Sequence, residues 1–341
     1  MSNARKLADN LPTDGSLSGR NVIVNGDMTI SQRGTSFSTG TNTMYTLDRF
    51  QSAVGSSFNF DCTMTQSTDA PTGFHTSLKV SPDSTATPSA SQNGAIRYNI
   101  EAQDLQRFGY GSSDAKKMTL SFYVKSNKTG TYSLQLIGYD GQGTCLTSYT
   151  INSANTWERK SITFDPDTSN AFANDTTIGI LIAWHLASGP DDVRTASTSW
   201  GLTDTGFRIV SGQVNFMDST SNEWYLTGVQ LEIGSQASPF EHEPVGVTLS
   251  KCQRYFYRID RDNGTGNAVY ASGEYVANNH RLTITHPVTM RTTPTVTAAF
   301  NTSGVTIDYR SSVAASFYKT SAYRMDSSNS GNFYQADAEL S

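Results

Sequence analysis

The residues best suited to chemistry lie in one long polar segment, residues 187–207. This segment contains Trp200, the acidic pair Asp191 and Asp192, and Arg194. An indole face can stack on the C–H surface of a sugar ring, while carboxylate and guanidinium groups can hydrogen-bond to sugar hydroxyls. The segment is rich in Gly, Ser, Thr and Asp and lacks a strand period, which is typical of functional loops. We therefore expect these four side chains to form a glycan-binding site.

Trp200 also has a structural interpretation, because large aromatic side chains usually fold back onto a hydrophobic core. In that case the indole would be covered and the segment would lose its stacking surface. Trp184 and Trp224 lie in strand patterns and are expected in the core. The exposure of Trp200 therefore distinguishes the two interpretations.

An enzyme would need a converged set of catalytic groups, and the sequence shows no such motif. No two of the five histidines have the i, i+4 spacing of a metalloprotease helix. There is no Gly-x-Ser-x-Gly elbow, and the glycines of Gly138–Gly143 predict a hairpin turn. A glycosidase needs two carboxylates that face each other across a cleft, which sequence alone does not show. We expect a protein without enzymatic activity.

Composition favours a β-rich protein. Charged residues make up 16% of the 341 residues, aromatic residues 11%, and the net charge is −5. Thr, Tyr, Phe and Val favour strands, whereas Gly, Asn, Asp and Ser favour turns. No cluster of Lys and Arg indicates binding to nucleic acid, and no apolar run is long enough to span a bilayer.

Strands are the elements expected to position the polar segment. In residues 118–124 every second residue is apolar, which places Met118, Leu120, Phe122 and Val124 on one face. Similar patterns occur at 132–137, 161–164, 178–184 and 224–232, separated by turn-rich segments. The apolar run 21–27, which contains Asn-Gly, also predicts a strand, and Gly228 inside its strand predicts a bulge. Strands with one polar face indicate an antiparallel sandwich.

The two ends of the chain are predicted to differ from the sandwich. Residues 2–11 could form a short helix before a Gly/Ser-rich linker, serving either as a docking peptide or as a frayed terminus. A boundary is expected near 239–246, followed by a helical turn that runs into a strand at 249–258 and then by further strands. The three cysteines lack zinc-finger or redox spacing and are expected to be buried thiols: Cys62, Cys145 and Cys252.

The C-terminal region is dense in aromatic residues for its size. Such a surplus is expected where subunits bury each other's surfaces, so we expect this region to drive oligomerisation. The alternative is a core within one chain. The aromatic residues are Tyr255, Phe256, Tyr257, Phe317, Tyr318, Tyr323, Phe333 and Tyr334.

Several strings in a fixed order carry a family resemblance. They are NVIVNGDMTISQRG (21–34), YTLDRF (45–50), NIEAQDLQRF (99–108), MTLSFYVKSNKTGTY (118–132), TWERKSITF (156–164), LTGVQLEIGSQASPFEHE (226–243) and ADAEL (336–340). This order resembles the tail-fibre and virion appendage proteins of tailed bacteriophages, especially marine ones, that carry a carbohydrate-binding-module-like jelly roll. The resemblance implies an antiparallel jelly-roll sandwich, a smaller C-terminal β domain and often a homotrimer.

Some residues in these strings have a plain structural interpretation. Asp48 and Arg49, beside Tyr45, are predicted to form a buried ion pair at the edge of the sandwich rather than to contact a ligand. Glu101 is predicted either to play a similar part or to help bind calcium. A structural calcium ion is an implication of the resemblance, and no other cofactor is expected. Further carboxylates that could bind calcium are Asp61, Asp140, Asp191 and Asp192.

These expectations give three parts: a docking segment and linker at 1–20, a jelly roll at 21–243 and a C-terminal β domain at 244–341. The expected function is that of a virion structural protein, made in the bacterial cytoplasm, that contacts host surface glycans as a tail fibre or receptor-binding appendage. Other virion proteins would bind near its N-terminus. A purely structural capsid decoration, fibre or tail adaptor protein is the alternative, and a polysaccharide-degrading tailspike enzyme is the third.

Overall fold

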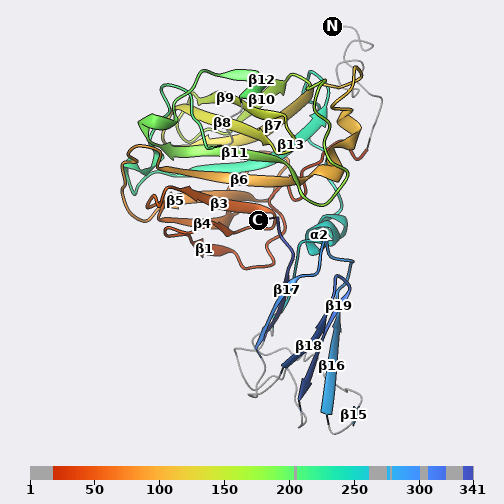
Figure 1. The fold of residues 1–341 in the computed structure, drawn as a ribbon. Coiled ribbons are helices and arrows are strands. Elements are labelled where there is room, and N and C mark those ends of the chain that lie inside the picture. The colour runs from red at the N-terminus through yellow and green to blue at the C-terminus, as the bar shows by residue number, and fades with distance from the viewer. Residues whose placement is uncertain are drawn as a thin grey trace. The chain divides into compact units, whose positions relative to one another are not determined.

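The computed structural model describes residues 18–202, 206–260, 275–276, 279–299, 306–319 and 333–340. It divides the chain into two compact units, residues 1–244 and 245–341. Regular structure is mostly strand, and the named strands of the described residues pair antiparallel (Figure 1). The all-β fold predicted from the sequence is therefore confirmed. The predicted N-terminal helix at 2–11 lies outside the described residues.

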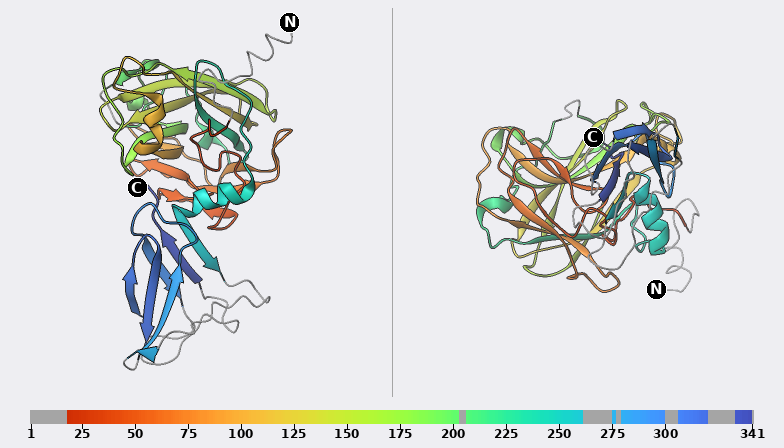
Figure 2. Two further views of the ribbon diagram at one scale, coloured as in Figure 1. Left: turned by 90° about the vertical axis from the view of Figure 1, so that its right-hand side faces the viewer. Right: turned by 90° about the horizontal axis from the view of Figure 1, so that it is seen from below.

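The first unit contains two sheets that pack face to face (Figure 2). Sheet A has the order β1 (Ser36–Ser38), β4 (Cys62–Ser67), β5 (Ser77–Pro82), β13 (Trp224–Ile233), β7 (Met118–Ser126) and β10 (Glu158–Phe164). Sheet B has the order β12 (Ser197–Leu202), β9 (Gly143–Ile151), β8 (Gly130–Gly138), β11 (Ile178–Ser188), β6 (Asn93–Glu101), β3 (Phe50–Gly55) and β2 (Met44–Tyr45). Three short 3-10 helices join strands: η1 (Ala102–Phe108), η2 (Pro190–Asp192) and η3 (Phe216–Asp218).

The strand order is that of a jelly roll. Four strands of sheet A have the order β5-β13-β7-β10, and four strands of sheet B have the order β6-β11-β8-β9. Successive strands along the chain therefore alternate between the two layers, except at the β8–β9 hairpin. Two such four-stranded layers form the eight-stranded double sheet of the jelly-roll fold. The remaining strands, β1 and β4 in sheet A and β2, β3 and β12 in sheet B, extend these layers at their edges.

The core between the sheets follows the alternation in the sequence. Met118, Leu120, Phe122 and Val124 are all buried, as their period of two predicted. Trp184 contacts Phe122 edge to face, with ring centroids 5.8 Å apart. Each such side chain contributes roughly 1.5–3 kcal/mol through the apolar surface that it removes from water.

Residues 21–27 form turns, so the strand predicted there is wrong. Asn25 and Met28 have φ angles of 62° and 60°, which a strand does not accommodate. The Asn25 side chain donates to the carbonyls of Ile30 and Asp48 and accepts from the Ile30 amide. The apolar run is explained by burial instead, since Ile23 and Met28 belong to the core between the sheets.

The bulge predicted at Gly228 is confirmed. The pairing of β13 with β7 shifts register between Thr227 and Gln230, and Gly228 has a φ of 61°. A Cβ atom at this position would lie 2.7 Å from the Phe74 ring, so glycine is needed for space as well as for backbone conformation. Beyond the bulge, Gln230 donates to Glu232, which also accepts from the amide of Ser238. This part of the LTGVQLEIGSQASPFEHE string is thus a buried structural network.

The second unit begins with the helix α2 (Val245–Gln253) and continues with two small sheets. One has the order β14 (Phe256–Asp260), β20 (Phe333–Asp337) and β17 (Thr295–Ala299). The other has the order β15 (Tyr275–Val276), β16 (Asn279–Thr285), β19 (Ala314–Lys319) and β18 (Thr306–Arg310). In the described parts of the chain, no helix has the length and apolarity needed to cross a bilayer.

Burial within one chain accounts for four of the C-terminal aromatic residues: Tyr255, Phe256, Phe317 and Tyr334. Phe317 and Tyr334 belong to the apolar cluster of the second unit, together with Leu282 and Ile284. Their number therefore does not require a partner subunit. Tyr323 lies outside the described residues. The homotrimer stays a prediction.

Candidate functional site

The segment 187–207 is more ordered than the open loop expected from its sequence. It contains the end of β11, the turn η2 and the edge strand β12, which pairs with β9 through Ser197 and Leu146. Gly189 permits the tight approach before η2, because a Cβ atom there would lie 2.2 Å from the carbonyl oxygen of Ala90. Residues 203–205 lie outside the description. The polar composition thus reflects turns and a short edge strand.

Trp200 is partly buried against the core between the sheets. Its Nε1 donates a hydrogen bond of 3.1 Å to the hydroxyl of Tyr110. Tyr110 in turn stacks on Phe172, with ring centroids 5.0 Å apart. These contacts favour the structural interpretation of Trp200 over the stacking site expected from the sequence. The physical reason is that the indole N–H and much of the ring find partners inside the protein.

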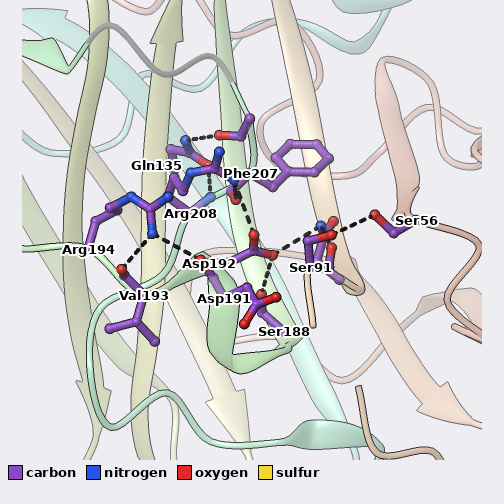
Figure 3. Close-up of polar contacts among 12 residues, drawn as sticks. Ser56, Ser91, Gln135, Ser188, Asp191, Asp192, Val193, Arg194, Phe207 and Arg208 are labelled. Carbon is purple, nitrogen blue, oxygen red and sulfur yellow. Dashed lines mark hydrogen bonds and ion pairs between the residues drawn. The ribbon is translucent and has the colours of Figure 1, made fainter. Parts of the chain in front are cut away.

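Asp192 is buried, which removes it from the surface where a glycan contact was expected. Its Oδ1 lies 3.1 Å from Nη1 of Arg208, and its Oδ2 accepts from Ser188 at 3.1 Å and from Asn93 at 3.5 Å (Figure 3). Burial raises the pKa of the Asp192 carboxyl, opposed by the Ser188 hydrogen bond and the Arg208 charge. Because its partners come from the protein, this carboxylate fixes the chain after β11.

Asp191 and Arg194 remain at the surface of the turn. Nη1 of Arg194 donates to the carbonyl of Asp191 at 2.9 Å and to that of Val193 at 2.8 Å (Figure 3). The four side chains predicted to form one site thus have separate neighbours: Trp200 contacts Tyr110, Asp192 is buried below the turn, and the other two are exposed.

A hydrogen-bond network holds residues 206–208 against the face of sheet B that points away from sheet A, called here the outer face. Oε1 of Gln135 accepts from the Arg208 amide and from Nε2 of His185, both at 3.0 Å, and its Nε2 donates to the Gly206 carbonyl at 2.8 Å. Since Oε1 is an acceptor, His185 carries its proton on Nε2. Burial lowers the pKa of His185 to about 3, so the ring is neutral.

Phe207 packs on a floor of small and aliphatic residues on the outer face. The floor consists of Ala53 on β3, Ala95 on β6, Ile137 on β8, and Leu181 and Ala183 on β11. Three of the five are alanines, so the side chains in the middle of this face are short. The Phe207 ring also meets His185 edge to face at a centroid distance of 5.5 Å.

Beside this floor lies a row of aromatic and polar side chains, which we call the outer-face patch: Tyr45, Gln51, Arg97 and Tyr139. The registers pair Tyr45 with Gln51, and Gln51 with Arg97, across β2, β3 and β6. Nε of Arg97 donates to Oε1 of Gln51. Tyr139 directly follows β8 and is 48% exposed. The patch therefore combines an exposed phenol with a fixed guanidinium.

The members of the patch interact electrostatically. Burial lowers the pKa of Arg97, and the phenols of Tyr45 and Tyr139 act in the opposite direction. Burial raises the pKa of Tyr139, opposed by the Arg97 charge, so its hydroxyl stays protonated at neutral pH. Each phenol can then both donate and accept a hydrogen bond.

Of the residues given a structural role, Asp48, Arg49 and Glu101 are buried and Tyr45 is half-buried, and the hydrogen-bond partners differ from those expected. Asp48 accepts two hydrogen bonds of 2.6 Å from the amide and side chain of Gln32 rather than from Arg49. Arg49 donates to the Asn99 carbonyl at 2.6 Å. Oε2 of Glu101 accepts from Gln103 at 2.6 Å.

Among the residues that the structure describes, no three His, Cys, Asp or Glu side chains converge on a possible metal ion. Oδ2 of Asp140 accepts from the Ala173 amide. The three cysteines are free and buried, as expected. Burial raises the pKa of the Cys62 and Cys145 thiols, so these groups are unreactive.

The sequence matches no family model and no curated protein. Among solved structures, the enzymatically active domain of bacteriophage CBA120 tailspike protein 4 is 15% identical over 63% of this chain and 21% of its own, with a TM-score of 0.34. TmCBM61 in complex with β-1,4-galactotriose is 8% identical over 63% of this chain and all of its own, at 0.31. The family 11 carbohydrate-binding module from Clostridium thermocellum, with a mixed-linked tetrasaccharide, is 11% identical over 60% of this chain and all of its own, at 0.30. At these values the likeness assigns no function to this chain.

Proposed function

We propose that this chain is a glycan-binding protein without catalytic activity and that the outer-face patch makes the contact. The observation that carries the proposal is the exposure of Tyr139, whose phenol interacts with the charge of Arg97. A half-exposed phenol near a guanidinium offers a ligand an aromatic face together with hydrogen-bond donors.

The chemistry of the patch suits a sugar. Tyr139 offers an aromatic face for the C–H surface of a ring, and the hydroxyls of Tyr45 and Tyr139 can bond to sugar hydroxyls. The bond from Arg97 to Gln51 fixes the guanidinium in place before a ligand arrives. Such a prepared arrangement limits the entropy lost on binding.

The biological setting that we propose is the virion of a tailed bacteriophage, where the chain would serve as a tail fibre or receptor-binding appendage. The ordered strings that resemble such appendage proteins support this setting. Host surface polysaccharide would be the ligand, and other virion proteins would bind near the N-terminus.

A microarray of bacterial surface polysaccharides tests the glycan-binding function. We expect the purified full chain to bind at least one polysaccharide, and Tyr139→Ala to reduce that binding by about tenfold or more, as for loss of a central aromatic contact. Trp157→Ala is a matched control, because Trp157 is a partly exposed aromatic residue that directly precedes β10 of sheet A, away from the patch. Equal binding by wild type and Tyr139→Ala would rule out the patch as the contact.

A purely structural role is the second candidate, and the packing of Trp200 and Asp192 within the chain favours it. In that case the jelly roll would act as a spacer in a capsid decoration or tail adaptor protein. Cryo-electron microscopy of the particle distinguishes the two roles. A distal tail position with the outer face exposed supports glycan binding, whereas burial of this face against neighbouring subunits supports the structural role.

A further inference from the structure

Arg97 is a partly buried cation without an acidic partner. In the described parts of the chain, its hydrogen bond goes to Gln51 and its charge interacts with the phenols of Tyr45 and Tyr139. No carboxylate there lies within ion-pair distance of it. The guanidinium is half-buried and therefore keeps donors available to a ligand.

Five other basic side chains in this unit are paired with a carboxylate. Four of these pairs measure 2.5–3.1 Å: Lys79 with Glu223, Lys128 with Asp218, Lys160 with Glu158, and Arg208 with Asp192. Lys125 is likewise paired with Asp69. Arg97 differs from these five cations in having a neutral side chain, Gln51, as its hydrogen-bond partner.

The groups that face Arg97 come from every neighbouring element and are all uncharged. Gln51 on β3 and Ala183 on β11 are its register partners, and Ala95 precedes it on the same face of β6. Tyr45 on β2 and Tyr139 after β8 complete the surroundings. Removing a cation from water without a counter-charge is unfavourable. An anionic ligand would therefore gain more binding free energy here than at an exposed arginine.

A planar guanidinium matches the geometry of a carboxylate, to which it can donate two parallel hydrogen bonds. We infer that the ligand of the outer-face patch is an acidic polysaccharide, with a sugar carboxylate bound by Arg97 and the sugar ring stacked on Tyr139. This inference rests on the proposed glycan-binding function and narrows it to one class of glycan. Arg97 then determines specificity, because a neutral sugar leaves its charge unpaired.

Matched pairs of polysaccharides provide the test: alginate, polygalacturonate and hyaluronate, each beside its own carboxyl-reduced, neutral product. We expect the full chain to bind at least one acidic member about tenfold more tightly than its reduced product, and added NaCl to weaken only the acidic binding. Arg97→Gln should abolish this preference, whereas Arg97→Lys should retain part of it. Arg159→Gln, on sheet A, removes an equal charge and should change nothing.

The outcomes separate this inference from the function on which it rests. Equal binding to acidic and reduced members, binding to neutral glycans alone, or an unchanged preference in Arg97→Gln would overturn the acidic-ligand inference and leave glycan binding intact. If the folded wild-type chain bound no glycan, acidic or neutral, on these pairs and on the wider microarray, the proposed function itself would fail. Thermal melts of each variant confirm that the variant is folded.

Discussion

The indole of Trp200 donates its hydrogen bond to the hydroxyl of Tyr110, and the two rings meet edge to face at a centroid distance of 6.0 Å. This relationship joins the edge strand β12 to the segment after η1, two parts of the chain far apart in sequence. It makes Trp200 a packing residue. Under the proposed function, the sugar ring would stack elsewhere, on Tyr139, which is exposed next to β8.

Truncation of Trp200 should therefore affect stability rather than binding. Trp200→Ala removes a partly buried ring and leaves a cavity beside Tyr110, so we expect a loss of roughly 2–3 kcal/mol in the free energy of unfolding. Tyr110→Phe, which removes the hydrogen bonds of this hydroxyl with Trp200 and with the Asp165 carbonyl, should cost about 1 kcal/mol. Urea denaturation measures both values. A Trp200→Ala protein that is fully stable but no longer binds glycan would restore the interpretation made from the sequence.

Glu158 should stabilise the β9–β10 connection in a pH-dependent way. Burial alone would raise its pKa, but hydrogen bonds from Lys160 and from the Ser153 and Asn152 amides together lower it to about 2, against 4.5 for the free group. A lowered pKa in the folded state means that the stabilisation is present above pH 4.5 and is lost as the pH falls towards 2.

The Glu158→Gln variant checks this effect. We expect it to be less stable than wild type by roughly 2 kcal/mol at pH 7, since each unit of pKa shift corresponds to about 1.4 kcal/mol before screening by solvent. The two unfolding curves should converge near pH 2. The measurement compares the two proteins with each other at each pH. The raised pKa values of Asp48 and Asp192 lower the stability of both proteins as the pH rises, so this effect cancels in the comparison.

His185 should make the protein sensitive to mild acid. Its pKa is lowered to about 3 in the folded state by burial, whereas an unfolded histidine titrates near 6.5. The stabilisation by the neutral ring is therefore complete above pH 6.5 and is lost as the pH falls. Thermal melts between pH 7 and pH 5 should show a decline in wild type that is smaller in His185→Gln. Parallel curves for the two proteins would contradict this assignment.

We propose that the predicted homotrimer uses the edge strand β18. All five of its residues are exposed, and Ile307 and Tyr309 are 40% and 59% exposed. An exposed edge strand favours pairing with another chain. Light scattering should show a trimer for wild type at micromolar concentration and a monomer for Ile307→Lys/Tyr309→Lys. A monomeric wild-type chain would rule out self-association.

Periodicity predicted the parts of the fold that depend on local alternation. The apolar face of β7 and the core positions of Trp184 and Trp224 follow from a period of two, because one side of each strand must be buried. Residues 21–27 have a similar apolar content but adopt turns. There the tertiary hydrogen bonds of the Asn25 side chain, which sequence alone does not show, determine the backbone.

The candidate site was harder to predict, because it depends on which strands become neighbours. Tyr45 and Arg97 are brought together by the order β2-β3-β6 and are far apart in the sequence. A signal was nevertheless present, since Arg97 places a charge directly between Ile96 and Tyr98 in a strand. The acidic pair Asp191 and Asp192 was misleading for the opposite reason. Only the arrangement of β11, η2 and Arg208 decides that one carboxylate is buried and the other exposed.

A crystal structure of the chain with the polysaccharide fragment that binds most tightly on the microarray tests the central claim most directly. The account predicts that the sugar lies on the outer face of sheet B, with one ring against Tyr139 and a polar group of the sugar bonded to Arg97. A sugar bound instead at Asp191 and Arg194, or on sheet A, with the outer-face patch left empty, would contradict it.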